Sequence, residues 1–145
     1  MTQEQKELLL KDLCARLDTN LVCSIYRTDD EGVGYRDEIL HGYCKGDIWY
    51  EFYFREDCSI GIDDVSKFKP YLFPLSSMTA EQKEFIKNKF CYDWDIDDHP
   101  YSLWTYCIGI GDVDELIDWF HKNHIDYRGL IPMGLANDAT GLNIY

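Results

Sequence analysis

The chain has 145 residues, enough for one domain of ordinary size, and 46% of them are aliphatic, aromatic or cysteine residues. It can therefore bury a hydrophobic core, which excludes wholesale disorder. The formal net charge of -13 repels phosphate groups and disfavours direct binding to nucleic acid or to an anionic membrane surface. We expect a single domain over residues 1–145 that binds basic proteins, cations or neutral ligands, although the same charge would also serve solubility alone.

The sequence predicts a cytoplasmic protein. No apolar run approaches the roughly 20 residues that span a bilayer, and the first five residues, MTQEQ, lack the pattern of a signal peptide. The cysteines contain no CxxC pair, so we expect them to be reduced and buried, with no zinc site and no cofactor. They are Cys14, Cys23, Cys44, Cys58, Cys91 and Cys107.

The first 36 residues predict a helix, a strand and an acidic loop. The string TQEQ at residues 2–5 has the form of a capping box, and leucines follow at helical spacing, which predicts a helix over about residues 3–17. Alternating apolar residues predict a strand over residues 20–27. Residues 28–36 are rich in acidic residues and glycine, which predicts a mobile loop. The acidic residues of this loop, candidates for contact with a basic partner, are Asp29, Asp30 and Glu31.

The middle of the chain contains the clearest β pattern. Residues 38–44 and 47–54 flank Lys45-Gly46 and predict a tight hairpin. One face of the second arm is apolar and aromatic and should enter the core, whereas the alternate residues form a mixed face. The residues of the core face are Ile48, Tyr50, Phe52 and Phe54. A further short strand is expected over residues 59–62.

The second half of the chain predicts two more helices and one more strand. Pro70 and Pro74 are expected to break the segment that contains them. Capping boxes at residues 79–82 and 112–115 predict helices that end near Lys89 and Asn123; the apolar stripe of the second comprises Leu116, Trp119 and Phe120. Residues 104–110 predict a strand. The resulting fold class is α+β, with a mainly antiparallel sheet of about four strands and three helices packed on one face.

A row of aspartates allows three interpretations. The EF-hand pattern fails because its sixth position is Asp98 and its twelfth is Trp104, where glycine and glutamate are required. In a strand, alternate carboxylates would lie about 6.7 Å apart on one face, a spacing that could imitate the phosphates of a nucleic acid toward a basic partner. A solvated edge that discourages aggregation is the third interpretation. The candidate binding residues of this row are Asp93, Asp95, Asp97 and Asp98.

The histidines near the end of the chain form the sole His–carboxylate cluster of the sequence. Asp118 and His121 are three residues apart and can meet on a helix face, with His124 and Asp126 following. The spacing matches no zinc motif. The cluster could serve a small metal-dependent hydrolase, or the histidines could complement the dipole at a helix end. We assign no catalytic residue and no metal site to it.

Three segments together resemble a family of uncharacterised small acidic proteins from intestinal anaerobic bacteria, their phages and mobile elements. They are TQEQKELLLKDLCARL at residues 2–17, KPYL with PLSSMT at residues 69–79, and a tail that contains DYRGLI at residues 126–131. Pro132-Met133 stands where a charged pair is expected. The resemblance implies a shared scaffold and a mobile-element setting, and it implies no catalytic residues.

The predicted function is that of a non-enzymatic acidic interaction protein. It would bind a basic groove of a host nuclease or other nucleic-acid-handling protein, as an anti-defence or anti-CRISPR-type inhibitor does. The alternatives are the small metal-dependent hydrolase built on His121 and His124, and a structural or assembly factor.

Overall fold

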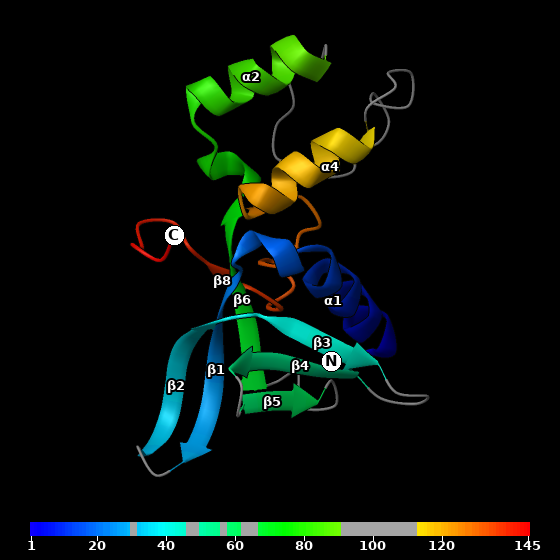
Figure 1. The fold of residues 1–145 in the computed structure, drawn as a ribbon. Coiled ribbons are helices and arrows are strands. Elements are labelled where there is room, and N and C mark those ends of the chain that lie inside the picture. Colours follow the sequence, from blue (N-terminus) through cyan, green and yellow to red (C-terminus); the bar gives the residue numbers. More distant parts are fainter. Residues whose placement is uncertain (30–31, 46–49, 56–57, 62–66, 91–112) are drawn as a thin grey trace.

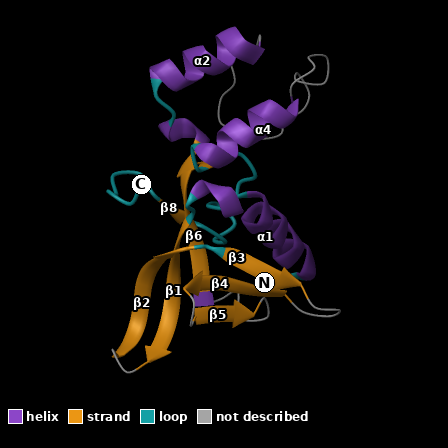
Figure 2. Cartoon of the chain, in the orientation of Figure 1, coloured by secondary structure: helices purple, strands orange, loops and turns teal. Residues whose placement is uncertain are grey.

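The computed structural model describes residues 1–29, 32–45, 50–55, 58–61, 67–90 and 113–145 (Figure 1). Among the described residues a run of strands, β1 to β6, separates α1 from α2 and α4, in the manner of an α+β protein (Figure 2). None of the described helices is long and apolar enough to cross a membrane. In chain order the elements are α1 (Gln3–Ala15), β1 (Val22–Asp29), β2 (Gly32–Ile39), β3 (Gly42–Lys45), β4 (Tyr50–Arg55), β5 (Cys58–Gly61), β6 (Phe68–Pro74), α2 (Ala80–Phe90), α4 (Val113–Lys122), β7 (Ile125–Asp126) and β8 (Asn137–Asp138).

The larger of the two described sheets has five strands. Its order is β2-β1-β6-β7, and β8 also pairs with β6. β1 is antiparallel to both β2 and β6, whereas β7 and β8 run parallel to β6. The second sheet, β3-β4-β5, is antiparallel throughout. The predicted fold class, α+β with a mainly antiparallel sheet, is therefore confirmed.

Two hydrophobic clusters hold these elements together. In the first, Leu9 and Leu13 of α1 pack with residues of both sheets, among them Ile25, Phe52 and Phe68. The second joins α2, α4 and the segment after α4, and its buried residues are Met78, Ile86, Phe90, Leu116, Phe120, Ile125 and Tyr127. α1 thus covers the core shared by the two sheets, and α2 and α4 lie together beyond the end of β6 (Figures 1 and 2).

The helix starts follow the sequence. At α1 the Thr2 hydroxyl accepts a hydrogen bond from the Gln5 amide, and the Gln5 side chain accepts one from the Thr2 amide. Thr79 and Gln82 make the same pair of bonds before α2. Each reciprocal pair satisfies two of the amide groups that a helix start leaves without a partner. The capping boxes predicted at Thr2 and Thr79 are therefore confirmed, whereas the third begins at Asp112, outside the described residues.

The loop predicted over residues 28–36 is wrong for most of its length. β1 continues to Asp29 and β2 begins at Gly32, and the two strands pair in continuous register from Val22↔Ile39 to Asp29↔Gly32. The glycines at 32 and 34 lowered the strand signal, but cross-strand pairing with β1 overrides that local preference.

The prolines do not break the segment that contains them, because β6 runs from Phe68 to Pro74 and joins three other strands. Pro70 lies opposite Cys23. The Leu40 amide donates to the Leu21 carbonyl at 2.8 Å. In an antiparallel ladder every second residue bonds to the same neighbouring strand, so the N–H and C=O groups of Cys23, two residues after Leu21, also point toward β2. The β1–β6 ladder therefore needs no N–H group from Pro70.

The predicted hairpin exists in a shifted form. β3 pairs with β4, Lys45 lies opposite Tyr50 rather than forming the turn, and residues 38–39 belong to β2. Phe52 and Phe54 are fully buried, as the alternation predicted. The strand predicted over residues 104–110 lies outside the described residues.

The cysteine prediction is confirmed only in part. Cys14, Cys23 and Cys44 are free thiols. Cys23 is buried and Cys14 is half-buried, as expected of cysteines in a core. Cys44 is exposed, and the sequence prediction that the cysteines are buried is wrong for this residue.

Candidate functional site

The acidic residues predicted to bind a partner lie mostly outside the described part of the chain. This holds for Asp30 and Glu31 and for the whole row from Asp93 to Asp98. Asp29 is the last residue of β1, opposite Gly32. The role of these residues in binding a partner therefore stays a prediction.

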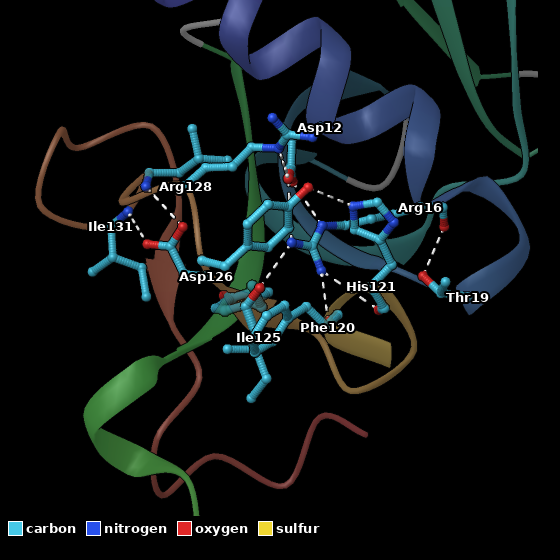
Figure 3. Close-up of polar contacts among 12 residues, drawn as sticks. Asp12, Arg16, Thr19, Phe120, His121, Ile125, Asp126, Arg128 and Ile131 are labelled. Atoms are coloured by element: carbon cyan, nitrogen blue, oxygen red, sulfur yellow. Dashed lines mark hydrogen bonds and ion pairs between the residues drawn. The ribbon is translucent and has the colours of Figure 1, made fainter. Parts of the chain in front are cut away.

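Two members of the His–carboxylate cluster, His121 and Asp126, are buried near Asp12 and Arg16, at the end of α4 and in the segment that follows it (Figure 3). Asp126 is buried, and its two carboxylate oxygens accept hydrogen bonds from the amides of Leu130 and Ile131, each at 2.8 Å. Burial raises the pKa of Asp126 and these two amides counteract the shift. Asp118 is exposed on α4. Asp126 therefore orders the turn after β7, and its oxygens already have partners.

Both histidines of the cluster are neutral near neutral pH. Burial, and next the charge of Arg16, lower the pKa of His121 and of His124 to about 4. The His121 Nε2 atom lies 3.0 Å from the Tyr127 hydroxyl. The His124 ring stacks on Tyr145 with ring centres 3.7 Å apart. The lowered pKa values argue against charged histidines that complement the helix dipole.

Arg16 takes that role instead. Its side chain is fully buried, and all five of its N–H groups have acceptors. Two go to the Asp12 carboxylate, with the Nε–Oδ2 pair at 2.7 Å, and the others to the carbonyls of Phe120, His121 and Ile125. The first two of those carbonyls lie in the last turn of α4, and the His121 carbonyl also accepts the His124 amide at 3.1 Å. Arg16, the residue that follows α1, thus places a cation at the C-terminus of α4, where positive charge is favoured.

Arg128 completes the network. Its Nε donates to Asp12 Oδ1 at 3.1 Å, and its guanidinium carbon lies 4.7 Å from the centre of the Tyr127 ring. The charges of Asp12 and Asp126 balance those of Arg16 and Arg128, which is the condition under which such groups can be buried. The sequence prediction missed this set, although Asp12 and Arg16 stand at the i,i+4 spacing of a helical ion pair.

This arrangement is suited to linking elements rather than to chemistry. The carboxylates of Asp12 and Asp126 and the ring of His121 make contacts within the protein. The described residues include no group of three or more histidine, cysteine or acidic side chains placed to hold a metal ion. His124 differs in one respect: its Nδ1 atom is buried with no hydrogen-bond partner among the described residues. The stacked Tyr145 has its hydroxyl 2.6 Å from the Tyr71 carbonyl and accepts the Val22 amide.

A second candidate site is the outward face of β1 and β2. Tyr26 and Tyr35 are paired across the two strands, and their rings make an edge-to-face contact with centres 5.2 Å apart. Tyr35 is 65% and Val33 67% exposed, and both lie on this face. Farther along the same face, Asp37 accepts a hydrogen bond from the Tyr71 hydroxyl at 2.9 Å. We call the exposed group Tyr26, Val33 and Tyr35 the tyrosine face. The sequence prediction missed it because it placed Val33 and Tyr35 in a loop.

Comparisons with protein-family models, with curated proteins and with solved structures gave no match to this chain.

Proposed function

We propose that this protein is an acidic interaction protein that binds a basic groove of a nucleic-acid-handling protein and thereby competes with nucleic acid. The observation that carries the proposal is the tyrosine face. Exposed aromatic side chains on a rigid paired ribbon offer large contact area at little loss of conformational freedom, and tyrosine is enriched in protein interfaces.

Charge supports a basic partner. The net charge of -13 attracts a positively charged groove during diffusional encounter and repels nucleic acid itself. Exposed Asp37 lies next to Tyr35 on the outward face. The predicted acidic row at Asp93–Asp98 and the resemblance to proteins of phages and mobile elements point in the same direction, toward an anti-defence inhibitor.

The hydrolase alternative has less support. A metal-dependent hydrolase on the His–carboxylate cluster would need open coordination positions. Asp126 instead uses both carboxylate oxygens for backbone amides, and the His121 ring contacts Tyr127. The structural role of these groups explains their burial without a reaction.

Affinity capture from the host cell tests the proposal. The wild-type protein should retain a basic nucleic-acid-handling protein, and the Tyr26→Ser/Tyr35→Ser double variant should lose it. Leu142→Ser is the matched control, because Leu142 is another exposed apolar residue far along the chain. Capture of the same proteins by all three, or of no basic protein by the wild type, would contradict the proposal.

A further inference from the structure

The outer edge of β2 has main-chain groups that no described strand pairs. β2 stands first in the order of its sheet and its partner is β1 (Figure 1). The Leu40–Leu21 hydrogen bond sets the alternation of the ladder, so the even-numbered residues of β2 turn their N–H and C=O groups toward β1. The odd-numbered residues turn theirs outward. Those farthest from the second sheet are Val33, Tyr35 and Asp37, and we call their outward main-chain groups the β2 edge.

The first half of this edge lacks the usual protection of an edge strand. Natural edges are blunted by charged side chains, lysine above all, by proline or by a bulge. β2 reads GVGYRDEI: its charged residues stand at positions 36–38, with Glu38 buried and paired with Arg27, whereas residues 32–35 have no charge, no proline and no break in register with β1. The glycines at 32 and 34 leave open space beside the backbone, because a Cβ atom added at either would have no neighbour within 4 Å among the described residues. A strand that adds to the edge therefore has room for a side chain beside these glycines, on the face opposite Tyr35.

The net charge of the chain determines which kind of strand can pair with the β2 edge. A second copy of the chain would bring another charge of -13 and would place further carboxylates near the exposed Asp37, so self-pairing is disfavoured. A strand rich in lysine or arginine is attracted instead. Its cationic side chains on the outward face could lie over the ring of Tyr35, an arrangement that aromatic rings favour.

We infer that the β2 edge binds an extended lysine- or arginine-rich segment of the partner protein, which adds to the sheet as a new strand. Main-chain hydrogen bonds to Val33, Tyr35 and Asp37 would supply affinity, and the tyrosine face would select the side chains of alternate residues. This inference rests on the proposed function, since it names the part of the basic partner that is recognised.

A synthetic peptide of about ten alternating lysine and valine residues serves as the probe, because a segment of that length covers β2 at the ordinary rise of a strand. Amide exchange of the full chain is followed by NMR. The amides of Val33, Tyr35 and Asp37 should exchange fast in the free protein and slowly with the peptide bound. The amides of Gly34 and Arg36, which point toward β1, should change little.

Two variants distinguish the contribution of the Val33 N–H group to peptide binding from that of its side chain. Val33→Pro removes one outward N–H group without removing a bond to β1, and it should weaken peptide binding about tenfold, the equivalent of one main-chain hydrogen bond. Val33→Ala keeps the N–H group and should bind nearly as the wild type does. The amide-exchange result on the wild type stands even if Val33→Pro fails to fold.

The outcomes distinguish this inference from the proposed function. Protection of other amides, equal binding by Val33→Pro and Val33→Ala, or no binding of the peptide would overturn strand addition at β2, while the capture experiment would still decide the proposed function. If a peptide with glutamate in place of lysine binds the β2 edge equally well, the edge is a docking site but the preference for a basic partner is refuted.

Discussion

Replacing Arg16 by methionine should destabilise the protein more than any other single loss of charge among the described residues. Methionine replaces the aliphatic stem of arginine and has no N–H group, so the change removes all five hydrogen bonds of the guanidinium while keeping the packed stem. Asp12 would remain buried with Arg128 as its cationic partner. The Phe120 carbonyl would lose its donor, and the carbonyls of His121 and Ile125 would keep only the amides of His124 and Tyr127.

The expected loss is about 3–5 kcal/mol in the free energy of unfolding, the range for removing one partner of a buried ion pair. That is a large fraction of the stability of an ordinary domain. Arg16→Lys should lie between the wild type and Arg16→Met, because an ammonium keeps the charge but offers three donors without the planar fork.

Urea denaturation followed by circular dichroism and tryptophan fluorescence gives the free energy of unfolding. Lys89→Met is the matched control, since Lys89 pairs with Glu115 at the surface and both side chains are well exposed. This control should cost less than about 1 kcal/mol. Equal losses in Arg16→Met and Lys89→Met would refute the account of the buried network.

Other expectations follow from the same region. The pKa of His121 is lowered to about 4 in the folded protein, whereas an unfolded chain binds a proton at this side chain near pH 6.5. Between these pH values His121 is protonated in the unfolded state and neutral in the folded state. Stability should therefore fall from about pH 6.5 toward 4, by at most about 1.4 kcal/mol per pH unit for each such histidine. His121→Gln should flatten this slope in pH-dependent urea melts, and the raised pKa of Asp126 acts in the opposite direction in both proteins. Tyr145→Phe should lower the free energy of unfolding by about 0.5–1.5 kcal/mol, because the Val22 amide and the Tyr71 carbonyl lose a shared partner at an exposed site; an unchanged urea midpoint would contradict this expectation. Tyr145→Ala should uncover the ring of His124 and raise its pKa from about 4 toward its ordinary value, as an NMR titration of the imidazole would measure.

Local signals predicted the elements that local physics determines. The capping boxes at Thr2 and Thr79 place two helix starts, because their hydrogen bonds form between residues three apart. Alternation in the second arm of the hairpin predicted the burial of Phe52 and Phe54. Both features can be recognised in a single stretch of sequence without knowledge of its partners.

Long-range pairing explains the elements that the sequence prediction missed. Glycine-rich β2 and proline-containing β6 become strands because β1 pairs with both. Asp12 and Arg128 are 116 residues apart, and no periodic pattern connects them. The tyrosine face follows from the same pairing, since the contact between Tyr26 and Tyr35 exists only once β1 and β2 are in register.

Displacement of nucleic acid tests the central claim most directly. The partner recovered by affinity capture is loaded with a fluorescently labelled nucleic acid, and the anisotropy is followed as the wild-type protein is added. The account predicts that the nucleic acid is released, that release weakens as salt screens the charges, and that the Tyr26→Ser/Tyr35→Ser variant releases far less. A complex in which partner, nucleic acid and this protein remain bound together, or equal release by the variant, would contradict the claim.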